Sequence, residues 1–240
     1  MRMTLLCIAM LIGISSGTLV KAEDKPEAPN KDIPQLQVRT HYMQAQNYAE
    51  YGIYEDAITE FKKALEADPN FVDARFELGV TYVNMGRLDD AIREYRKVLE
   101  TDPKHPRIHY ELALAYYDKG MTDEGIVICL DKLNNYPDKG NMHSLLGVLY
   151  IRKGSIDEAI AEFKKQIEFD HHPEMGYVNL GMALVKKGAV DEAIQAFKKS
   201  IELNPRNPRT HYQLGDAYKK KGMEEEAEKE TAIYRGLMGR

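Results

Sequence analysis

The chain has 240 residues, of which 43% are hydrophobic, and its formal net charge is −5. This apolar content is sufficient for a folded core. The acidic balance argues against a protein that binds nucleic-acid phosphates, so we expect no nucleic-acid partner.

Residues 1–22 have the three-part pattern of a secretory signal peptide. Arg2 precedes an apolar run from Met3 to Ile14, and small residues follow up to Ala22. This order is typical of a leader that is removed on export, with cleavage expected after Ala22. Because the apolar stretch is close to the lower length limit for crossing a bilayer, an uncleaved anchor is the alternative. We therefore expect an exported protein, periplasmic or secreted, or one anchored by its N-terminus on the extracytoplasmic side of a membrane.

Residues 23–35 differ in composition from both neighbouring segments. They contain Pro26, Pro29 and Pro34 together with charged residues, and they are nearly free of apolar side chains. Such a segment cannot bury enough apolar surface to fold alone. The sequence predicts a proline-rich linker here, with helices beginning near Leu36.

Residues 36–240 repeat with a period of 34 residues. A glycine recurs at this spacing six times, at Gly52, Gly86, Gly120, Gly154, Gly188 and Gly222. A fixed period of this length is the signature of a solenoid built from stacked units. We assign six repeats, at residues 38–71, 72–105, 106–139, 140–173, 174–207 and 208–240.

Residues 177–205 show how one unit folds. Leu180 and Leu184 lie one helical turn apart and predict the packing face of a first helix. That helix ends at Gly188, because glycine adopts the left-handed conformation without steric cost. Asp191 belongs to an acidic pair that opens a second helix, where negative charge is favourable. The same pair recurs as Glu55–Asp56, Asp89–Asp90, Asp123–Glu124, Asp157–Glu158 and Glu225–Glu226.

Further residues recur at fixed offsets: Leu-Gly, an aromatic residue, alanine, a second aromatic residue and proline. They stand at Leu78, Gly79, Tyr82, Ala91, Tyr95 and Pro103, at Leu146, Gly147, Tyr150, Ala159 and Phe163, and at Leu180, Gly181, Ala193, Phe197 and Pro205. This pattern resembles the tetratricopeptide repeat family over residues 38–240. The first unit departs from it, with Gln44 and Ala45 in place of Leu-Gly. The resemblance implies an all-α, right-handed superhelical solenoid of about six helix-turn-helix repeats.

The third unit deviates most from the others. Gly125 replaces the alanine and Cys129 replaces the second aromatic residue. Glycine costs about 1 kcal/mol in a helix, and cysteine fills less volume than phenylalanine. We expect looser packing in this unit, with Cys129 as a buried structural thiol; drift in a tolerant repeat explains both changes.

Catalytic and metal-binding patterns are missing from the sequence. There is no nucleophile beside a base, no phosphate-binding glycine loop after a strand and no metal-ligand spacing. Four histidines occupy the same place in their units, but residues one repeat apart lie on helices too distant to share an ion. We expect no enzyme activity, no cofactor and no metal; these histidines are His41, His109, His143 and His211.

A second apolar stripe runs along the first helices, about 100° from the packing stripe. In the tetratricopeptide repeat family this side lines the concave groove that binds partner segments. Contiguous apolar surface of this kind marks an interaction site, although superhelical curvature could bury part of it. The predicted partner-binding residues are Phe76, Val80, Val83, Tyr110, Leu114, Tyr117, Val148, Ile151, Val178, Met182 and Val185.

Basic residues flank this stripe. Arg107, Arg152, Lys186 and Arg209 are the predicted groove rim, which suits a partner with an apolar face and acidic flanks. The groove positions carry aromatic and aliphatic residues rather than the lysine, asparagine and arginine that the family uses to hold a carboxylate terminus, so we expect no such clamp.

We therefore expect a non-enzymatic scaffold or adaptor of the cell envelope that binds a protein or peptide in its concave groove. A self-associating scaffold that forms homo-oligomers is the alternative. An accessory subunit of an envelope enzyme is a third interpretation, since a fold does not specify a pathway.

Overall fold

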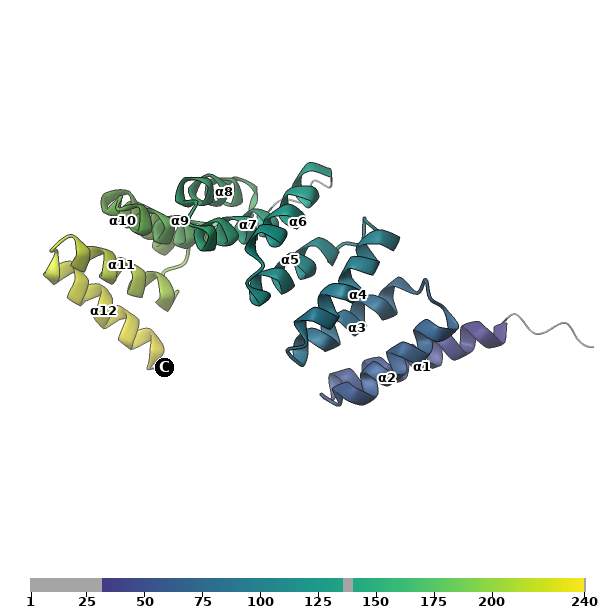
Figure 1. Ribbon diagram of the computed structural model, residues 1–240. Helices are drawn as coiled ribbons and strands as arrows, with labels where there is room; N and C mark the ends of the chain where they lie inside the picture. The colour runs from purple at the N-terminus through teal and green to yellow at the C-terminus, as the bar shows by residue number, and fades with distance from the viewer. Residues whose placement is uncertain (1–31, 136–139, 240) are drawn as a thin grey trace, which may run out of the picture.

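The computed structural model describes residues 32–135 and 140–239, and these residues form twelve α-helices (Figure 1). The predicted signal peptide and residues 23–31 of the predicted linker lie outside this range. The first helix begins at Asp32, four residues before the expected start at Leu36. Pro34 therefore belongs to the first helical turn, where its missing N–H costs no hydrogen bond.

The helices form six consecutive pairs, and each helix packs against the helices before and after it in the chain. Figure 1 shows the pairs stacked in chain order into an arch, which confirms the predicted all-α solenoid. We call the odd-numbered member of each pair its first helix and the even-numbered member its second helix. The bounds are α1 (Asp32–Glu50), α2 (Tyr54–Ala67), α3 (Val72–Asn84), α4 (Leu88–Thr101), α5 (Ile108–Lys119), α6 (Thr122–Asn135), α7 (Gly140–Lys153), α8 (Ile156–Phe169), α9 (Glu174–Lys187), α10 (Val190–Leu203), α11 (Pro208–Lys220) and α12 (Glu224–Met238).

The turn inside each pair is set by the periodic glycine. All six of these glycines have positive φ, for example 82° at Gly120 and 86° at Gly188. Both residues end their helices in the left-handed conformation, which other residues adopt only at a cost. After the turn, α10 starts without a side-chain cap but carries Asp191 and Glu192 in its first turn. Charge at the helix N-terminus therefore supplies the local stabilisation that a cap would give.

The glycine has a packing role in three of the four Leu-Gly pairs. A Cβ atom on Gly79 would lie 2.4 Å from the Tyr95 ring, and one on Gly147 or Gly181 would lie 2.5 Å from the Phe163 or Phe197 ring. Tyr95 and Phe197 are themselves fully buried. In these three repeats the two helices therefore approach so closely that only glycine fits between the first helix and the aromatic ring.

The hydrophobic core is divided near the third repeat. One cluster of buried side chains spans α1 to α5, and another spans α8 to α12. A smaller cluster around Ile126, Cys129 and Leu146 lies between them. Cys129 is fully buried, and burial raises the pKa of its thiol to about 12. The thiol is therefore protonated at neutral pH and packs as a small apolar group.

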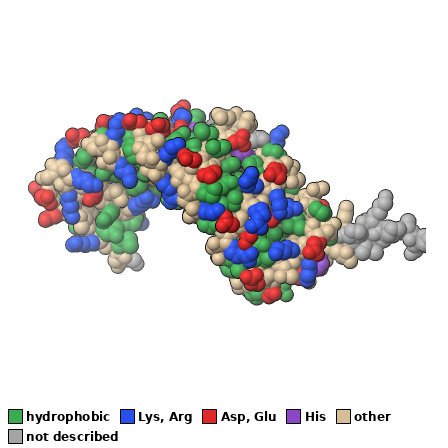
Figure 2. Space-filling model, in the orientation of Figure 1, with side chains coloured by type: hydrophobic (Ala, Val, Ile, Leu, Met, Phe, Trp, Pro, Cys, Tyr) green, Lys and Arg blue, Asp and Glu red, His purple; other side chains and the backbone are tan. Residues whose placement is uncertain are grey.

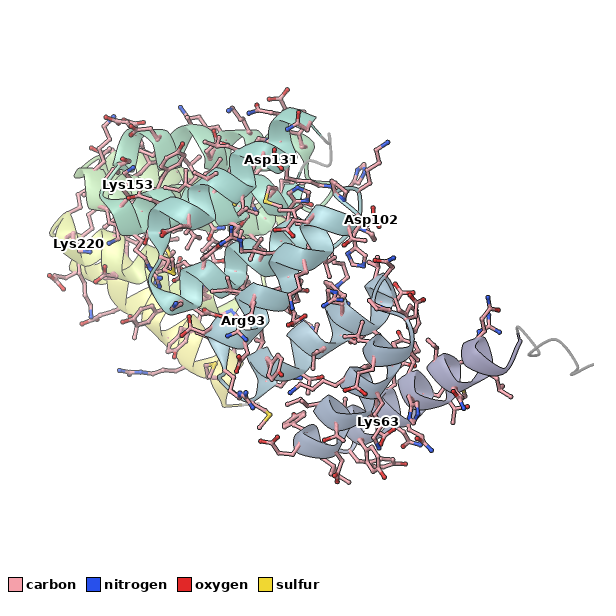
Figure 3. The ribbon with its side chains drawn as sticks, turned by 45° about the vertical axis from the view of Figure 1, so that its right-hand side comes forward. Lys63, Arg93, Asp102, Asp131, Lys153 and Lys220 are labelled. Atoms are coloured by element: carbon pink, nitrogen blue, oxygen red, sulfur yellow. The ribbon has the colours of Figure 1, made fainter. Side chains whose placement is uncertain are left out.

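A series of ion pairs joins consecutive repeats. Lys153 pairs with Asp123 and Lys187 pairs with Asp157, each at 2.8 Å between the ammonium nitrogen and a carboxylate oxygen. Lys153 is labelled in Figure 3. In each pair the lysine ends a first helix and the aspartate opens the second helix of the preceding repeat, so all the pairs fix the same stacking register. The other two are Lys119–Asp89 and Lys221–Asp191.

The first helices lie on the inner side of the arch. Direct contacts join α1 to α3, α5 to α7, α7 to α9 and α9 to α11. In a curved stack the elements on the inner side approach one another most closely, so the first helices line the concave face. Figure 2 shows this face as a hollow on the lower side of the molecule, between its N-terminal and C-terminal repeats. None of the helices in residues 32–135 and 140–239 has the length and apolar content to cross a bilayer.

Candidate functional site

A pocket of about 670 Å³ opens on the concave side of α7, α9 and α11. We call it the concave pocket. Tyr117 of α5 closes one end of it. The structure brings six of the predicted site residues together here: Tyr117, Val148, Ile151, Met182, Lys186 and Arg209.

The apolar part of the concave pocket comes from Val148, Ile151 and Met182. All three are half-buried and pack against the C-terminal core cluster, so each holds a fixed position while part of its side chain remains accessible. The Met182 sulfur also accepts a contact at 3.5 Å from the guanidinium of Arg209. Methionine adapts its shape to irregular apolar groups. The pocket can therefore take aliphatic side chains of more than one shape.

One wall of the concave pocket is polar. The Asn179 side-chain nitrogen donates to Gln166 Oε1 at 3.3 Å and to Ser144 Oγ at 3.4 Å. Both distances are longer than the usual 2.9 to 3.0 Å for a good N–H···O bond. The predicted stripe does not include these residues, because it comprises only apolar positions. Asn179 lies one position after Val178 on the same first helix, and this adjacency was the available signal.

Lys186 and Arg209 supply positive charge at the edge of the concave pocket. Both are exposed, and neither forms an ion pair with a described residue. Arg152 behaves differently, since its guanidinium lies 3.5 Å from the centre of the Tyr117 ring and donates to the Tyr117 carbonyl oxygen. Lys186 and Arg209 are therefore available to an acidic ligand, whereas Arg152 holds Tyr117 in place.

The predicted site residues of α3 have another environment. Phe76 is only 3% exposed, and the guanidinium of Arg107 lies 4.9 Å from the centre of its ring. Arg107 also pairs with Glu111 at 2.8 Å. Val80 and Val83 are half-buried against the N-terminal core cluster. Phe76 therefore contributes to the core and is covered on its concave side.

The remaining predicted residues are spread along the array. Tyr110 is 37% exposed and lines a separate pocket of about 300 Å³ with Arg107. Leu114 is half-buried against the central cluster, and Val185 packs against the C-terminal one. Val178 is fully buried. The eleven stripe residues thus do not form one continuous accessible surface.

Negative charge gathers on the concave side of α3 and α5. Burial, together with the nearby carboxylates of Asp73 and Glu111, raises the pKa of Glu77 above its ordinary value, and Arg107 opposes this shift. In the C-terminal half, Lys186 and Arg209 line the concave pocket together with the acidic residues Asp170 and Glu174.

The repeated histidines pair with carboxylates inside their own repeats. His41, His143 and His211 each contact a glutamate of the second helix at 2.6 Å, and His109 contacts Asp131 at 3.0 Å. In the second repeat Arg75 takes the same place. These pairs join the two helices of one repeat. In the described part of the chain, no three histidine, cysteine or acidic side chains are close enough to hold a metal ion.

Three structures show the same architecture. A tetratricopeptide repeat protein from Parabacteroides merdae has a TM-score of 0.69 at 20% identity, covering 81% of this chain and 77% of that one. PilF of Pseudomonas aeruginosa has a TM-score of 0.67 at 20% identity, over 85% and 93% of the two chains. YrrB, described as having an unusual peptide-binding site, has a TM-score of 0.58 at 21% identity, over 74% and 91%. At these identities the likeness concerns the fold.

Sequence comparison gives the family. The TPR repeat profile matches residues 45–86, 81–120 and 181–222, and the tetratricopeptide repeat profile matches residues 141–171. Among curated protein sequences none is significantly similar to this chain. The two profiles together cover more than half of the chain, at the spacing that the glycines and Leu-Gly pairs set. The chain therefore belongs to the tetratricopeptide repeat family.

Proposed function

We propose that this protein is a non-enzymatic adaptor that binds a segment of a protein partner in the concave pocket. The observation that supports this most is the pocket itself, about 670 Å³ in volume, which combines half-buried aliphatic side chains with an amide wall and a basic edge. Ligand sites typically have an apolar lining with a few polar groups that fix orientation.

The chemistry of the concave pocket matches that of a polypeptide. Val148, Ile151 and Met182 offer apolar contact to a side chain. The Asn179 amide has both donor and acceptor groups, as a peptide backbone requires. Because its present hydrogen bonds are long, exchanging them for bonds to a ligand backbone costs little. Lys186 and Arg209 then favour acidic residues beside the bound segment.

The fold relatives are consistent with this proposal. YrrB shares the fold and is described as having a peptide-binding site. The peptide-binding site is a property of YrrB. At 21% identity, the likeness supports peptide binding by this chain through the shared architecture alone.

We further propose that the adaptor works outside the cytoplasm, as a periplasmic or secreted component of the cell envelope. This rests on the signal-peptide pattern of residues 1–22, which lie outside the described residues. N-terminal anchoring is the competing proposal. A fractionation blot of cells separates the two, because a cleaved chain appears in the soluble exported fraction and an anchored chain appears in the membrane fraction.

Self-association is the competing functional proposal. The residues at the two ends of the array bear on end-to-end stacking of one copy on another. Glu228 and Arg235 of α12 stand where the other five second helices carry isoleucine or leucine. Thr40 and Gln44 of α1 likewise replace mostly apolar residues. Polar side chains at these positions disfavour stacking one array on the end of another. The form of self-association that we consider is therefore a second copy entering the concave groove.

The test is crosslinked affinity purification from the native source with matched variants. Met182→Lys places a charge in the concave pocket, whereas Met43→Lys makes the same change at a methionine that is 67% exposed on α1. We expect the partner to be recovered with the wild type and with Met43→Lys and to be lost with Met182→Lys, while all three keep the same helical circular dichroism. Equal recovery with both variants would refute the concave-pocket proposal. Light scattering at high concentration checks self-association, which predicts a dimer that Met182→Lys dissociates.

A further inference from the structure

The outer face of α6 differs from that of every other second helix. Val127 is 62% exposed and Leu130 is 38% exposed. In the other repeats the positions of these two residues are mostly polar or charged. The equivalents of Val127 are Thr59, Arg93, Ala161, Gln195 and Lys229, and those of Leu130 are Lys62, Arg96, Lys164, Lys198 and Ala232.

Val127 lines a groove of about 400 Å³ on the convex side of the array, and Leu130 lies one helical turn further along α6. We call it the convex groove. Leu99 of α4 forms one wall, Val127 and Ile128 of α6 form the other, and Leu112 and Tyr116 of α5 lie between them. Its lining residues span 96–100 of α4 and 124–128 of α6, a little more than one helical turn on each helix. Its location on the second helices separates it from the concave pocket.

The sequence of α6 keeps the ion pair that joins the two helices of the repeat, although its outer face is apolar. In four other repeats a glutamate in the middle of the second helix, at the position of Glu162, pairs with the histidine or arginine of the first helix. In α6 that position is Ile128. The carboxylate has moved to Asp131, which lies 3.0 Å from His109 and is labelled in Figure 3. The histidine keeps a carboxylate partner, and the vacated position becomes apolar.

The rim of the convex groove is acidic. Glu100 and Glu124 line it, and neither forms an ion pair with a described residue. Arg96 is the one basic residue among those that line the groove. The outer faces of α2, α4, α8 and α10 carry two consecutive basic residues, such as Lys164–Lys165, whereas α6 has Leu130–Asp131 at that place. A ligand that carries basic residues is therefore favoured.

We propose that the convex groove is a second docking surface and that it binds an amphipathic helix of a partner protein. The helix would place aliphatic side chains against Leu99, Val127 and Ile128. Lysine or arginine residues at its edges would face Glu100 and Glu124. An apolar floor between two helices suits the apolar face of an amphipathic helix, which docks through residues spaced at i, i+3 and i+4. This surface is independent of the concave pocket, so the protein can join two partners at once.

The test uses a synthetic helix as the probe. The probe is a 16-residue peptide of leucine, alanine and lysine, with leucines at i, i+3, i+4 and i+7, and its counterpart carries glutamate for every lysine. NMR chemical-shift mapping on the isotope-labelled full chain is expected to place the lysine peptide at Leu99, Leu112, Val127 and Ile128. The glutamate peptide is expected to bind at least about tenfold more weakly, which equals about 1.4 kcal/mol.

Two variants test whether the convex groove itself binds the lysine peptide. The double variant Val127→Gln/Leu130→Lys installs residues that other repeats carry at these positions, and we expect it to weaken the lysine peptide about tenfold without loss of helicity. Leu203→Lys is the matched control, because Leu203 is 51% exposed on α10 and far from the groove. Unchanged binding by the double variant, or shifts confined to the concave face, would overturn the proposal. Concentration-dependent shifts of α6 without peptide would show that a second copy is the occupant and would overturn it as well.

Discussion

The two halves of the concave face carry similar apolar stripes but expose them differently. Over α3, Phe76 is buried and Arg107 covers its ring. Over α9, Met182 is half-buried beside an open pocket of about 670 Å³. The charges differ too, since Glu77 lies among carboxylates whereas Lys186 forms no ion pair with a described residue. The position of a residue in the repeat therefore does not determine its role, because the accessibility of its side chain depends on the neighbouring repeat.

The largest expected effect separates core residues from site residues. Phe76→Ala removes a buried ring and is expected to lower the free energy of unfolding by about 3–5 kcal/mol. Met182→Ala removes a half-buried side chain and is expected to cost clearly less. Urea denaturation followed by circular dichroism measures both. Equal losses would show that the two halves of the concave face do not differ in the way proposed here.

The next effect concerns the basic edge. Lys186→Glu/Arg209→Glu is expected to weaken binding of the captured partner by about tenfold or more, because the edge would then repel acidic residues. Lys62→Glu/Lys164→Glu changes the net charge equally on the outer helices and serves as the control. Affinities measured at two salt concentrations test whether the effect is electrostatic. The difference in affinity between the wild type and Lys186→Glu/Arg209→Glu should shrink at high salt, because salt screens exposed charges. If both double variants bind alike, net charge rather than the pocket edge governs binding.

A smaller effect is expected at the polar wall. Asn179→Ala removes one donor and acceptor group, and we expect it to weaken partner binding about fivefold, or about 1 kcal/mol. Asn84→Ala removes the same group from an exposed position at the end of α3 and should leave the affinity unchanged. Titration calorimetry with the purified partner measures the affinity of each variant. A loss of affinity in Asn84→Ala alone would place the partner on the N-terminal half.

The smallest effect is a pH dependence of the acidic half. The pKa of Glu77 is raised in the folded state, mainly by burial, so the folded protein favours the protonated carboxyl. The resulting destabilisation is fully present above the folded pKa and disappears as the pH falls below the unfolded value, near 4.3. Glu77→Gln imitates the protonated form. We expect it to raise Tm by about 1–3 °C at pH 7 and not at pH 3, as thermal unfolding at the two pH values can show. An equal gain in Tm at pH 7 and at pH 3 would show that ionisation of Glu77 is not the cause.

The fold could be predicted from the sequence because its signals are local. The glycines with positive φ and the acidic first turns fix each hairpin, and the Leu-Gly pairs at Gly79, Gly147 and Gly181 fix how closely the two helices of their repeats pack. The start of α1 was missed, because Pro34 suggested a linker although the first helical turn accepts proline.

The candidate site was only partly predictable. Spacing on one helix identified Val148, Ile151 and Met182, but it gave the same weight to Phe76 and Val178, which neighbouring helices bury. Burial by a neighbouring repeat is a long-range property that no pattern within one helix contains. The amide wall of Asn179 was missed for a related reason, since its partners lie on α7 and α8.

The central claim is that a partner segment occupies the concave pocket, and site-specific photo-crosslinking in cells tests it most directly. A photoreactive amino acid at position 182 faces the pocket, and one at position 59 lies on the exposed outer face of α2. The account predicts a crosslinked adduct with another protein from position 182, absent from position 59 and lost on adding Arg209→Glu. An adduct of the same protein from both positions, or no adduct from position 182 when partner capture is intact, would contradict it.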